Sequence, residues 1–301
     1  MLFAGVELGG TKCVAILARD PNDVVAREIV RTTSPDETLG FLEQILRKWS
    51  TSHDLSGLGI ASFGPIDVIP GSATYGHMLA TPKPGWPGAD IASRLRCAAG
   101  VPAAFDTDVN GAAFAEMRWG SGRGFDDFAY VTVGTGIGVG LIVGGKPTRG
   151  FAHCELGHVR VPRPAGGDWP GTCPFHGDCV EGLASGSALQ ARLGDRVAQL
   201  GEDHPVWDEV AWALAQLCHA IVCAAAPMRI AMGGGVLAHQ QHLIGKINLL
   251  LAASLNDYLH LPGEGQYVVA PELGLDAGPL GAVALAIEAV RPRSNLHETS
   301  Q

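Results

Sequence analysis

One three-part pattern occurs twice in this sequence. It consists of a short apolar run, a turn of glycine and threonine, and a second apolar run. The first turn is Gly9-Gly10-Thr11-Lys12 and the second is Gly134-Thr135-Gly136-Ile137-Gly138. Each copy predicts a β-hairpin, because glycine adopts the backbone conformations that tight turns require. Two distant copies indicate a duplicated architecture in which each of two lobes opens with such a hairpin.

The first turn contains the ingredients of a P-loop without its arrangement. A P-loop needs the spacing Gly-x4-Gly-Lys-Ser/Thr and a following helix, whereas the segment from Cys13 to Leu17 is β-like. The structural alternative for each turn is a plain hairpin connection. Small residues nevertheless let backbone amides and a threonine hydroxyl approach phosphate oxygens closely. We therefore expect both turns, and a third at Gly233-Gly234-Gly235-Val236-Leu237, to face a nucleotide.

Length and composition indicate a two-lobed α/β enzyme. At 301 residues the chain exceeds the size at which a single hydrophobic core keeps growing. Its net charge of -9 gives nucleic acid no general electrostatic attraction. The first residues lack a basic leader region, and no continuous apolar run reaches the roughly 18 residues of a membrane span. We expect a cytoplasmic protein that contacts neither membranes nor nucleic acid.

The lobe boundary is predicted near a glycine-rich linker at residues 120–124. We expect a small lobe of residues 1–118, a large lobe of residues 119–279 and a tail of residues 292–301. A last helix at about residues 280–291 is expected to pack back onto the first lobe.

Asp108 is the candidate catalytic base. It follows a predicted strand from Val101 to Phe105 and precedes a helix-like stretch from Gly111 to Arg118. The structural alternative is a helix N-cap. A carboxylate at the end of a strand, in a cleft that is expected to hold ATP, can accept the proton of an attacking sugar hydroxyl during phosphoryl transfer.

Two cysteines and two histidines have the spacing of a metal site, namely His158, Cys173, His176 and Cys179. Two thiolates and two imidazoles match the tetrahedral coordination of zinc. Four filled positions leave none for water, so such a zinc would be structural. His153 and Cys154 lie nearby and stay open as alternative ligands. The structural alternative is a set of ordinary thiols in a glycine-rich and proline-rich loop.

Two glutamates flank this metal site in sequence. Glu155 lies three residues before His158, and Glu181 lies two residues after Cys179. A zinc ion would hold both carboxylates near one place, where they could accept hydrogen bonds from vicinal sugar hydroxyls. The alternative is that they are ordinary solvated side chains.

Together these segments strongly resemble the ROK family of sugar kinases and repressors, over nearly the whole chain. They are Glu7-Leu8-Gly9-Gly10-Thr11-Lys12, Asp106-Thr107-Asp108-Val109-Asn110, Gly134-Thr135-Gly136-Ile137-Gly138, His153-Cys154-Glu155-Leu156-Gly157-His158 and the cysteine motif. Within the family, the stretch from Cys173 to Gly186 is similar to the fructokinase and mannokinase branch. Glu7 and the segment Thr81-Pro82-Lys83-Pro84-Gly85-Trp86 point the same way.

The resemblance implies an α/β fold of the actin-like ATPase (ribonuclease H-like) kind, duplicated into two lobes around a central cleft. It implies ATP with Mg2+, a structural Zn2+, and transfer of the γ-phosphoryl group to a hexose hydroxyl, commonly the 6-hydroxyl. Fructose is the expected hexose and a homodimer the expected assembly. Mannokinase, glucokinase and N-acetyl-hexosamine kinase activities are the alternatives within the family.

The resemblance also carries residue roles onto this sequence. Asp108 would be the base, the four cysteines and histidines would bind zinc, and Asn110, Glu155 and Glu181 would contact the sugar. The nucleotide site would comprise Gly9, Gly10, Thr11, Lys12, Thr135, Gly136, Ser187, Gly233, Gly234, Gly235, Val236 and Leu237. The chain departs from the usual pattern at Cys154 and Ser187, where proline is common, and at Gly111, where alanine is usual. These departures remove no chemical group but bear on sugar preference and nucleotide contacts.

Two functions of other classes compete with the kinase. A sugar-sensing repressor of the same family would need a DNA-binding segment, but the first predicted strand begins at Phe3 and the acidic charge opposes DNA contact. A dinucleotide-dependent oxidoreductase would need a glycine fingerprint that opens a helix after the first strand, whereas here a strand follows. We therefore expect the kinase.

Overall fold

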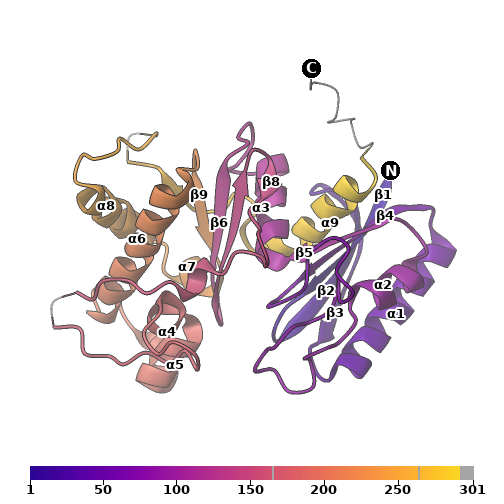
Figure 1. The fold of residues 1–301 in the computed structure, drawn as a ribbon, viewed down its shortest axis with the longest axis horizontal. Coiled ribbons are helices and arrows are strands. Elements are labelled where there is room, and N and C mark those ends of the chain that lie inside the picture. Colours follow the sequence, from indigo (N-terminus) through magenta and orange to yellow (C-terminus); the bar gives the residue numbers. More distant parts are fainter. Residues whose placement is uncertain (165, 264, 292–301) are drawn as a thin grey trace. The chain divides into compact units, whose positions relative to one another are not determined.

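The structure of the chain, a computed structural model, describes residues 1–164, 166–263 and 265–291. The described residues form two compact units (Figure 1). One unit contains Met1–Asp108 and the described residues from Pro279 onward, and the other contains Val109–Gly278. The lobe boundary expected after residue 118 stays a prediction, and the expected tail of residues 292–301 lies outside the described residues.

Each unit is built around one five-stranded sheet. The first sheet has the order β3-β2-β1-β4-β5, with bounds Asp23–Arg31, Lys12–Asp20, Leu2–Leu8, Leu55–Ser62 and Ala103–Thr107. The second has the order β8-β7-β6-β9-β10, with bounds Lys146–Pro147, Ile137–Val143, Phe128–Val133, Ile230–Gly233 and Val268–Val269. In both sheets the first two strand pairs are antiparallel and the last two are parallel. The units repeat one topology, which confirms the predicted duplication.

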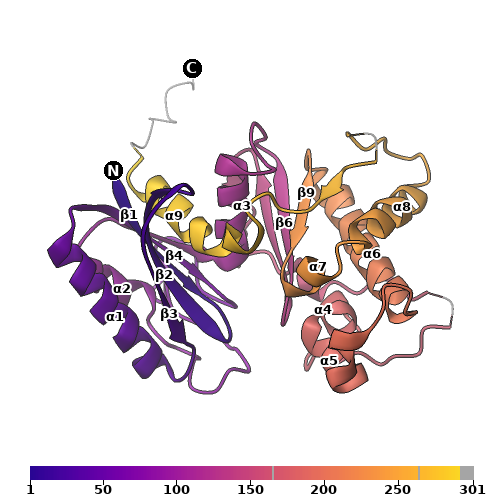
Figure 2. The same ribbon diagram turned by 180° about the vertical axis from the view of Figure 1, so that it is seen from behind.

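Helices cover both faces of the first sheet. α1 (Pro35–Ser52) and α2 (Ala92–Ala99) lie on one face, and α9 (Ala277–Ala289) lies on the other (Figures 1 and 2). α1 begins after Ser34, whose side-chain oxygen accepts a hydrogen bond from the Glu37 amide at 3.4 Å. The buried residues of α1 follow one another at helical spacing and form one face of the helix. They are Thr38, Leu39, Leu42, Leu46 and Trp49.

α9 approaches the first sheet closely because glycines face it. A Cβ added at Gly59 would overlap the carbonyl oxygen of Ala282, and one added at Gly5 would lie 3.0 Å from the Val283 nitrogen. Side chains at these two strand positions would push the helix away. The helix expected at residues 280–291 corresponds to α9, which ends at Ala289.

The second sheet is also covered on both faces. α3 (Asp108–Trp119) packs small residues against one face, where Ala112 and Ala113 join Phe128 and Tyr130 in one cluster. The main core of the unit lies on the other face, under α6 (Val206–Ala225) and α8 (Leu243–Leu255). Shorter elements complete the unit: η1 (Leu156–His158), α4 (Val180–Ala184), α5 (Gly186–Leu193), η2 (Gly194–Gln199), α7 (Gly235–His239) and η3 (Gly274–Asp276).

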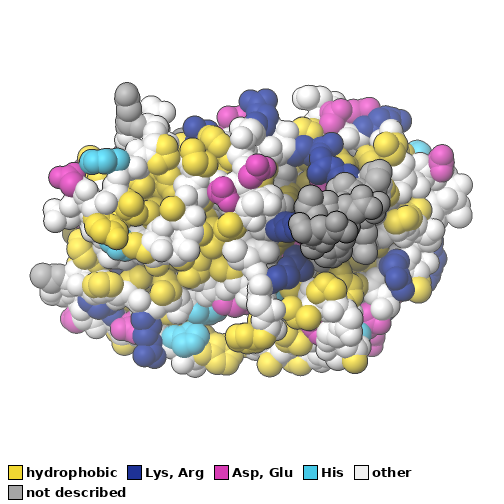
Figure 3. Space-filling model, turned by 45° about the horizontal axis from the view of Figure 1, so that its top comes forward, with side chains coloured by type: hydrophobic (Ala, Val, Ile, Leu, Met, Phe, Trp, Pro, Cys, Tyr) yellow, Lys and Arg dark blue, Asp and Glu magenta, His cyan; other side chains and the backbone are white. Residues whose placement is uncertain are grey.

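Within the described ranges, α6 is the one helix long and apolar enough to cross a membrane. Its Leu214, Leu217 and Ile221 are fully buried in the core of the second unit. This burial is what a core helix requires, and α6 is such a helix. Hydrophobic side chains are also exposed over parts of the face drawn in Figure 3, as on most folded proteins.

Candidate functional site

The first glycine turn joins β1 to β2 and holds its carbonyl groups in hydrogen bonds. The Gly9 carbonyl accepts from the Thr32 hydroxyl at 2.7 Å, the Thr11 carbonyl from the Thr32 amide at 3.0 Å, and the Lys12 carbonyl from the Gly9 amide at 3.0 Å. The Gly10 carbonyl accepts from the Lys83 ammonium group at 2.6 Å. Among the described residues, the amides of Gly10 and Thr11 have no hydrogen-bond partner. The turn therefore has free backbone N–H donors, whereas its carbonyl groups are already hydrogen-bonded.

The second glycine turn joins β6 to β7 and has the same property. The Gly134 carbonyl accepts from the Gly186 amide at 2.7 Å, and the Gly136 carbonyl accepts from the Gly134 amide at 2.9 Å. The Thr135 carbonyl accepts from the Ser187 amide at 3.3 Å. Within the described part of the chain, the amides of Thr135 and Gly136 have no partner. Exposed backbone donors with satisfied carbonyls suit an anion such as a phosphate group.

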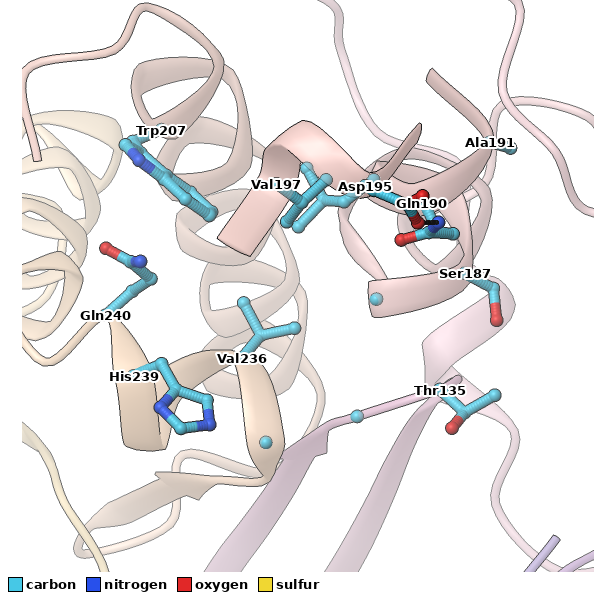
Figure 4. A pocket seen from close by; sticks show the side chains of 14 residues that line it. Thr135, Ser187, Gln190, Ala191, Asp195, Val197, Trp207, Val236, His239 and Gln240 are labelled. Atoms are coloured by element: carbon cyan, nitrogen blue, oxygen red, sulfur yellow. Dashed lines mark hydrogen bonds between the residues drawn. The ribbon is translucent and has the colours of Figure 1, made fainter. Parts of the chain in front are cut away.

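A cavity of about 1290 Å³ borders the second turn. Its walls come from the turn, α5, η2, the start of α6, and α7 (Figure 4). Thr135 and Ser187 lie at one end of this view, whereas Trp207 and Gln240 lie at the other. A cleft of this kind, with apolar walls and a few polar groups, is typical of a small-molecule site.

Some of the residues that line this cavity were predicted from the sequence, and others were not. Of the residues predicted to contact nucleotide, Thr135, Ser187, Gly235 and Val236 line it. Leu237 is buried in the core of the second unit. The lining residues that carried no sequence signal are Leu189, Gln190, Ala191, Asp195, Val197, Trp207, His239 and Gln240. All of them except Gln240 lie on α5, η2, α6 or α7, and none belongs to a sequence motif that indicates nucleotide binding.

The predicted metal ligands come together in a four-ligand cluster, made of His158, Cys173, His176 and Cys179. Their ligand atoms all lie within 4.8 Å of one another. The cluster contains neither His153 nor Cys154, the two alternatives that the sequence left open. Cys173 and His176 share a tight turn in which the Gly177 amide donates to the Cys173 carbonyl at 2.9 Å.

The distances within the cluster fit zinc. His158 Nδ1 lies 3.6 Å from Cys173 Sγ and 3.5 Å from Cys179 Sγ, and His176 Nδ1 lies 3.5 Å from Cys173 Sγ. A tetrahedral zinc with bonds of about 2.3 Å to sulfur and about 2.05 Å to nitrogen separates the two atoms by about 3.6 Å. Burial raises the pKa of the Cys179 thiol to about 11, and the neighbouring Cys173 thiol raises it too. A bound dication would instead favour the thiolates.

Both predicted glutamates lie beside this cluster. Glu181 Oε1 is 3.9 Å from His158 Nε2, and Glu181 Oε2 accepts a hydrogen bond from the Ile137 amide at 2.9 Å. Glu155 Oε1 is 3.5 Å from His153 Nδ1. Burial raises the pKa of Glu155, and the charge of Glu181 adds to the rise. The carboxylates of Glu155 and Glu181 therefore lie close to His153 and His158 in one region of the second unit.

Asp108 and Asn110 lie at the start of α3, directly after β5. Asp108 belongs to the first unit and Asn110 to the second, so the boundary between the units falls between the two residues. Asn110 is buried. In the first unit, the residues predicted to bind nucleotide are those of the glycine turn, Gly9 to Lys12. They are mostly exposed.

Known proteins resemble this chain over almost its whole length. The model of the ROK family matches residues 3–289. A fructokinase of Zymomonas mobilis is 38% identical over 295 residues, covering 96% of this chain and 97% of that protein. A fructokinase of Pediococcus pentosaceus is 37% identical over 291 residues, covering 97% of this chain and 99% of that protein.

Solved structures agree. A ROK hexokinase from Thermus thermophilus has a TM-score of 0.77 and 25% identity, covering 96% of this chain and 99% of its own. A ROK glucokinase from Streptomyces griseus, in complex with glucose and AMPPNP, has a TM-score of 0.74 and 26% identity, covering 96% and 100%. These similarities confirm the predicted actin-like, duplicated α/β fold. The family match and the relatives above 30% identity establish that this chain belongs to the ROK family.

Proposed function

We propose that the chain is an ATP-dependent fructokinase, which transfers the γ-phosphoryl group of ATP to the 6-hydroxyl of fructose. The observation that carries this proposal is the pair of glycine turns, each with its carbonyls bonded inward and two amides left to bind phosphate oxygens. The identity of 37–38% with fructokinases supports fructose as the sugar. Each of the two turns would bind a different part of the triphosphate.

The nucleoside would occupy the cavity beside the second turn. Thr135 and Ser187 would contact the phosphates nearest the ribose, and the end formed by Trp207 and Gln240 would accommodate the base. Gln190 donates a hydrogen bond to Asp195 at 3.0 Å, so both side chains are held in place at the cavity wall. The glycines at 233–235 would let the chain pass close to the ligand.

The sugar would be bound by carboxylates and an amide. Glu155 and Glu181 accept hydrogen bonds from hydroxyls, and Asn110 can donate and accept. Asp108 would take the proton of the attacking hydroxyl as the new bond from sugar oxygen to phosphorus forms. The bond between the γ-phosphorus and the bridging oxygen breaks at the same time and releases ADP. Mg2+ bound to the nucleotide phosphates would neutralise part of their charge.

The four-ligand cluster would hold a structural zinc. His158 would bind zinc through Nδ1, while its Nε2 is directed at Glu181, as metal-bound histidines commonly are toward a carboxylate. Zinc would thereby position a sugar-binding side chain without taking part in the transfer. We also propose a small lobe of residues 1–118, a large lobe of residues 119–279, a homodimeric assembly and a cytoplasmic location.

An assay of ADP release with a panel of hexoses tests the function. We expect the highest kcat/KM with fructose and lower values with mannose, glucose and N-acetylmannosamine. A higher value for another hexose would move the proposal to that sugar kinase. The fold is also that of a ROK transcriptional regulator, which matches with a TM-score of 0.74 at 17% identity. Sugar binding without ADP release for any hexose would therefore favour the sugar-sensing regulator.

A further inference from the structure

The segment Thr81-Pro82-Lys83-Pro84-Gly85-Trp86 has no part in the function proposed so far. It lies between β4 and α2 in the first unit and is anchored by Trp86, which is fully buried. The Trp86 indole donates to the Thr33 carbonyl at 2.9 Å, and its ring packs edge-on against Phe63 with centroids 5.1 Å apart. The Trp86 amide donates to the Lys83 carbonyl at 3.3 Å. Because prolines on either side restrict the backbone, Lys83 has a defined position.

Lys83 uses this position to reach the first glycine turn. Its ammonium group donates to the Gly10 carbonyl at 2.6 Å, although the two residues are 73 positions apart in sequence. In the described part of the chain, Lys83 forms no salt bridge with a carboxylate. One of its three N–H donors is used, and two are left for another acceptor.

The hydrogen bond between Lys83 and the Gly10 carbonyl adds little net stability to the fold. Fixing a long side chain costs rotamer entropy comparable to the stability that one hydrogen bond returns. The contact does have an electrostatic consequence, since it places a positive charge beside the amides of Gly10 and Thr11. A point charge next to backbone donors is a common arrangement for binding phosphate.

We propose that Lys83 is a catalytic residue that binds the γ-phosphoryl group of ATP at the first glycine turn. This inference rests on the proposed kinase function. The second turn borders the cavity proposed for the nucleoside. The first turn, with two free amides beside the Lys83 ammonium group, suits the more highly charged terminal phosphoryl group. Lys83 would neutralise charge on the oxygens of the group in transfer, while the sugar proton goes to Asp108 and the leaving oxygen stays with ADP.

The test compares Lys83→Met with Lys83→Arg, which keeps the charge. Titrations of Mg2+-AMPPNP and Mg2+-ADP, with tryptophan fluorescence as the readout, give the two Kd values. We expect Lys83→Met to weaken AMPPNP binding about 10-fold to 100-fold, and ADP binding less than about 3-fold. We also expect kcat with fructose to fall about 10²-fold to 10³-fold, with partial retention in Lys83→Arg.

The matched control is Lys48→Met, which removes the same charge from the exposed surface of α1. It should leave both Kd values and kcat unchanged. Thermal unfolding shows whether each variant is folded, and Lys83→Gln replaces Lys83→Met if the latter is not. Equal weakening of AMPPNP and ADP, or an unchanged kcat, would mean that Lys83 only shapes the turn.

The two proposals fail in different ways. A wild-type chain that phosphorylates fructose, together with a Lys83→Met variant of normal kcat and normal binding, overturns the Lys83 role alone. If the wild-type chain phosphorylates no hexose, but the Lys83→Met variant binds AMPPNP more weakly than the wild type does, the kinase function is overturned and the contact between Lys83 and the phosphoryl group is supported. A wild-type chain that binds no nucleotide overturns both.

Discussion

Glu181 accepts a hydrogen bond from the Ile137 amide at 2.9 Å, and this contact joins the four-ligand cluster to the second glycine turn. The connection is short in sequence as well. Cys179 is a cluster ligand, and seven and eight residues later the amides of Gly186 and Ser187 bond to the turn at Gly134 and Thr135. Whatever orders the cluster should therefore order the turn.

Metal analysis should find about one zinc per chain, because the cluster fills the four positions of a structural site. Removing zinc with a chelator should lower Tm by roughly 5–10 °C, as expected for loss of a ligand present at about 100 times its Kd. It should also weaken nucleotide binding, because the turn loses its support. A chain that contains no zinc and whose seven cysteines all react freely while folded would refute the site.

Glu181→Gln and Glu181→Ala should separate the charge of this residue from its hydrogen bond. The amide oxygen of Gln can still accept from Ile137, so this variant should keep its stability while KM for fructose rises. Ala leaves the Ile137 amide without its partner, which should cost about 1–3 kcal/mol of unfolding free energy in addition. Urea unfolding and fructose kinetics measure the two effects. Equal stability of both variants would contradict the role of the hydrogen bond.

Asp108→Asn should lower kcat about 10²-fold to 10⁴-fold, because it removes a proton acceptor and keeps the size of the side chain. KM for fructose and Tm should change little. Asp203→Asn, on an exposed loop of the second unit, is the matched control. Steady-state ADP release with fructose measures the effect, and near-normal turnover in Asp108→Asn would end the assignment of a base.

Val236→Phe should raise KM for ATP at least about tenfold, a loss of about 1.4 kcal/mol of binding, because the larger ring would project into the cavity. Fructose binding in the absence of nucleotide should be unaffected. Val143→Phe makes the same change at an exposed strand position and should leave KM unchanged. If the two variants behave alike, the nucleoside does not occupy this cavity.

Gly59→Ala and Gly40→Ala should change stability in opposite directions. A methyl group at Gly59 would overlap the Ala282 backbone, so α9 has to shift and the free energy of unfolding should fall by about 1–3 kcal/mol. Gly40 lies within α1 with no atom near an added Cβ, so Ala should add up to about 1 kcal/mol. Chemical denaturation of both variants checks the pair.

Several features were predictable from sequence because they depend on neighbours in the chain. A glycine turn between apolar runs specifies a hairpin locally, and both hairpins were found where expected. The cluster was predictable for a related reason, since three of its ligands lie within seven residues and the donor types suit one metal. α1 was predictable from the spacing of Leu39, Leu42 and Leu46.

The duplicated hairpins, the four-ligand cluster and the family could all be predicted from the sequence. Folding in three dimensions is what brings Gln190, Trp207 and His239 to one cavity, and what brings Lys83 to Gly10 across 73 positions. The difference arises because hairpins and metal motifs depend on contacts between residues close in the chain. Cavity walls and a reaching side chain depend instead on how separate helices and loops pack, and no local pattern records that packing.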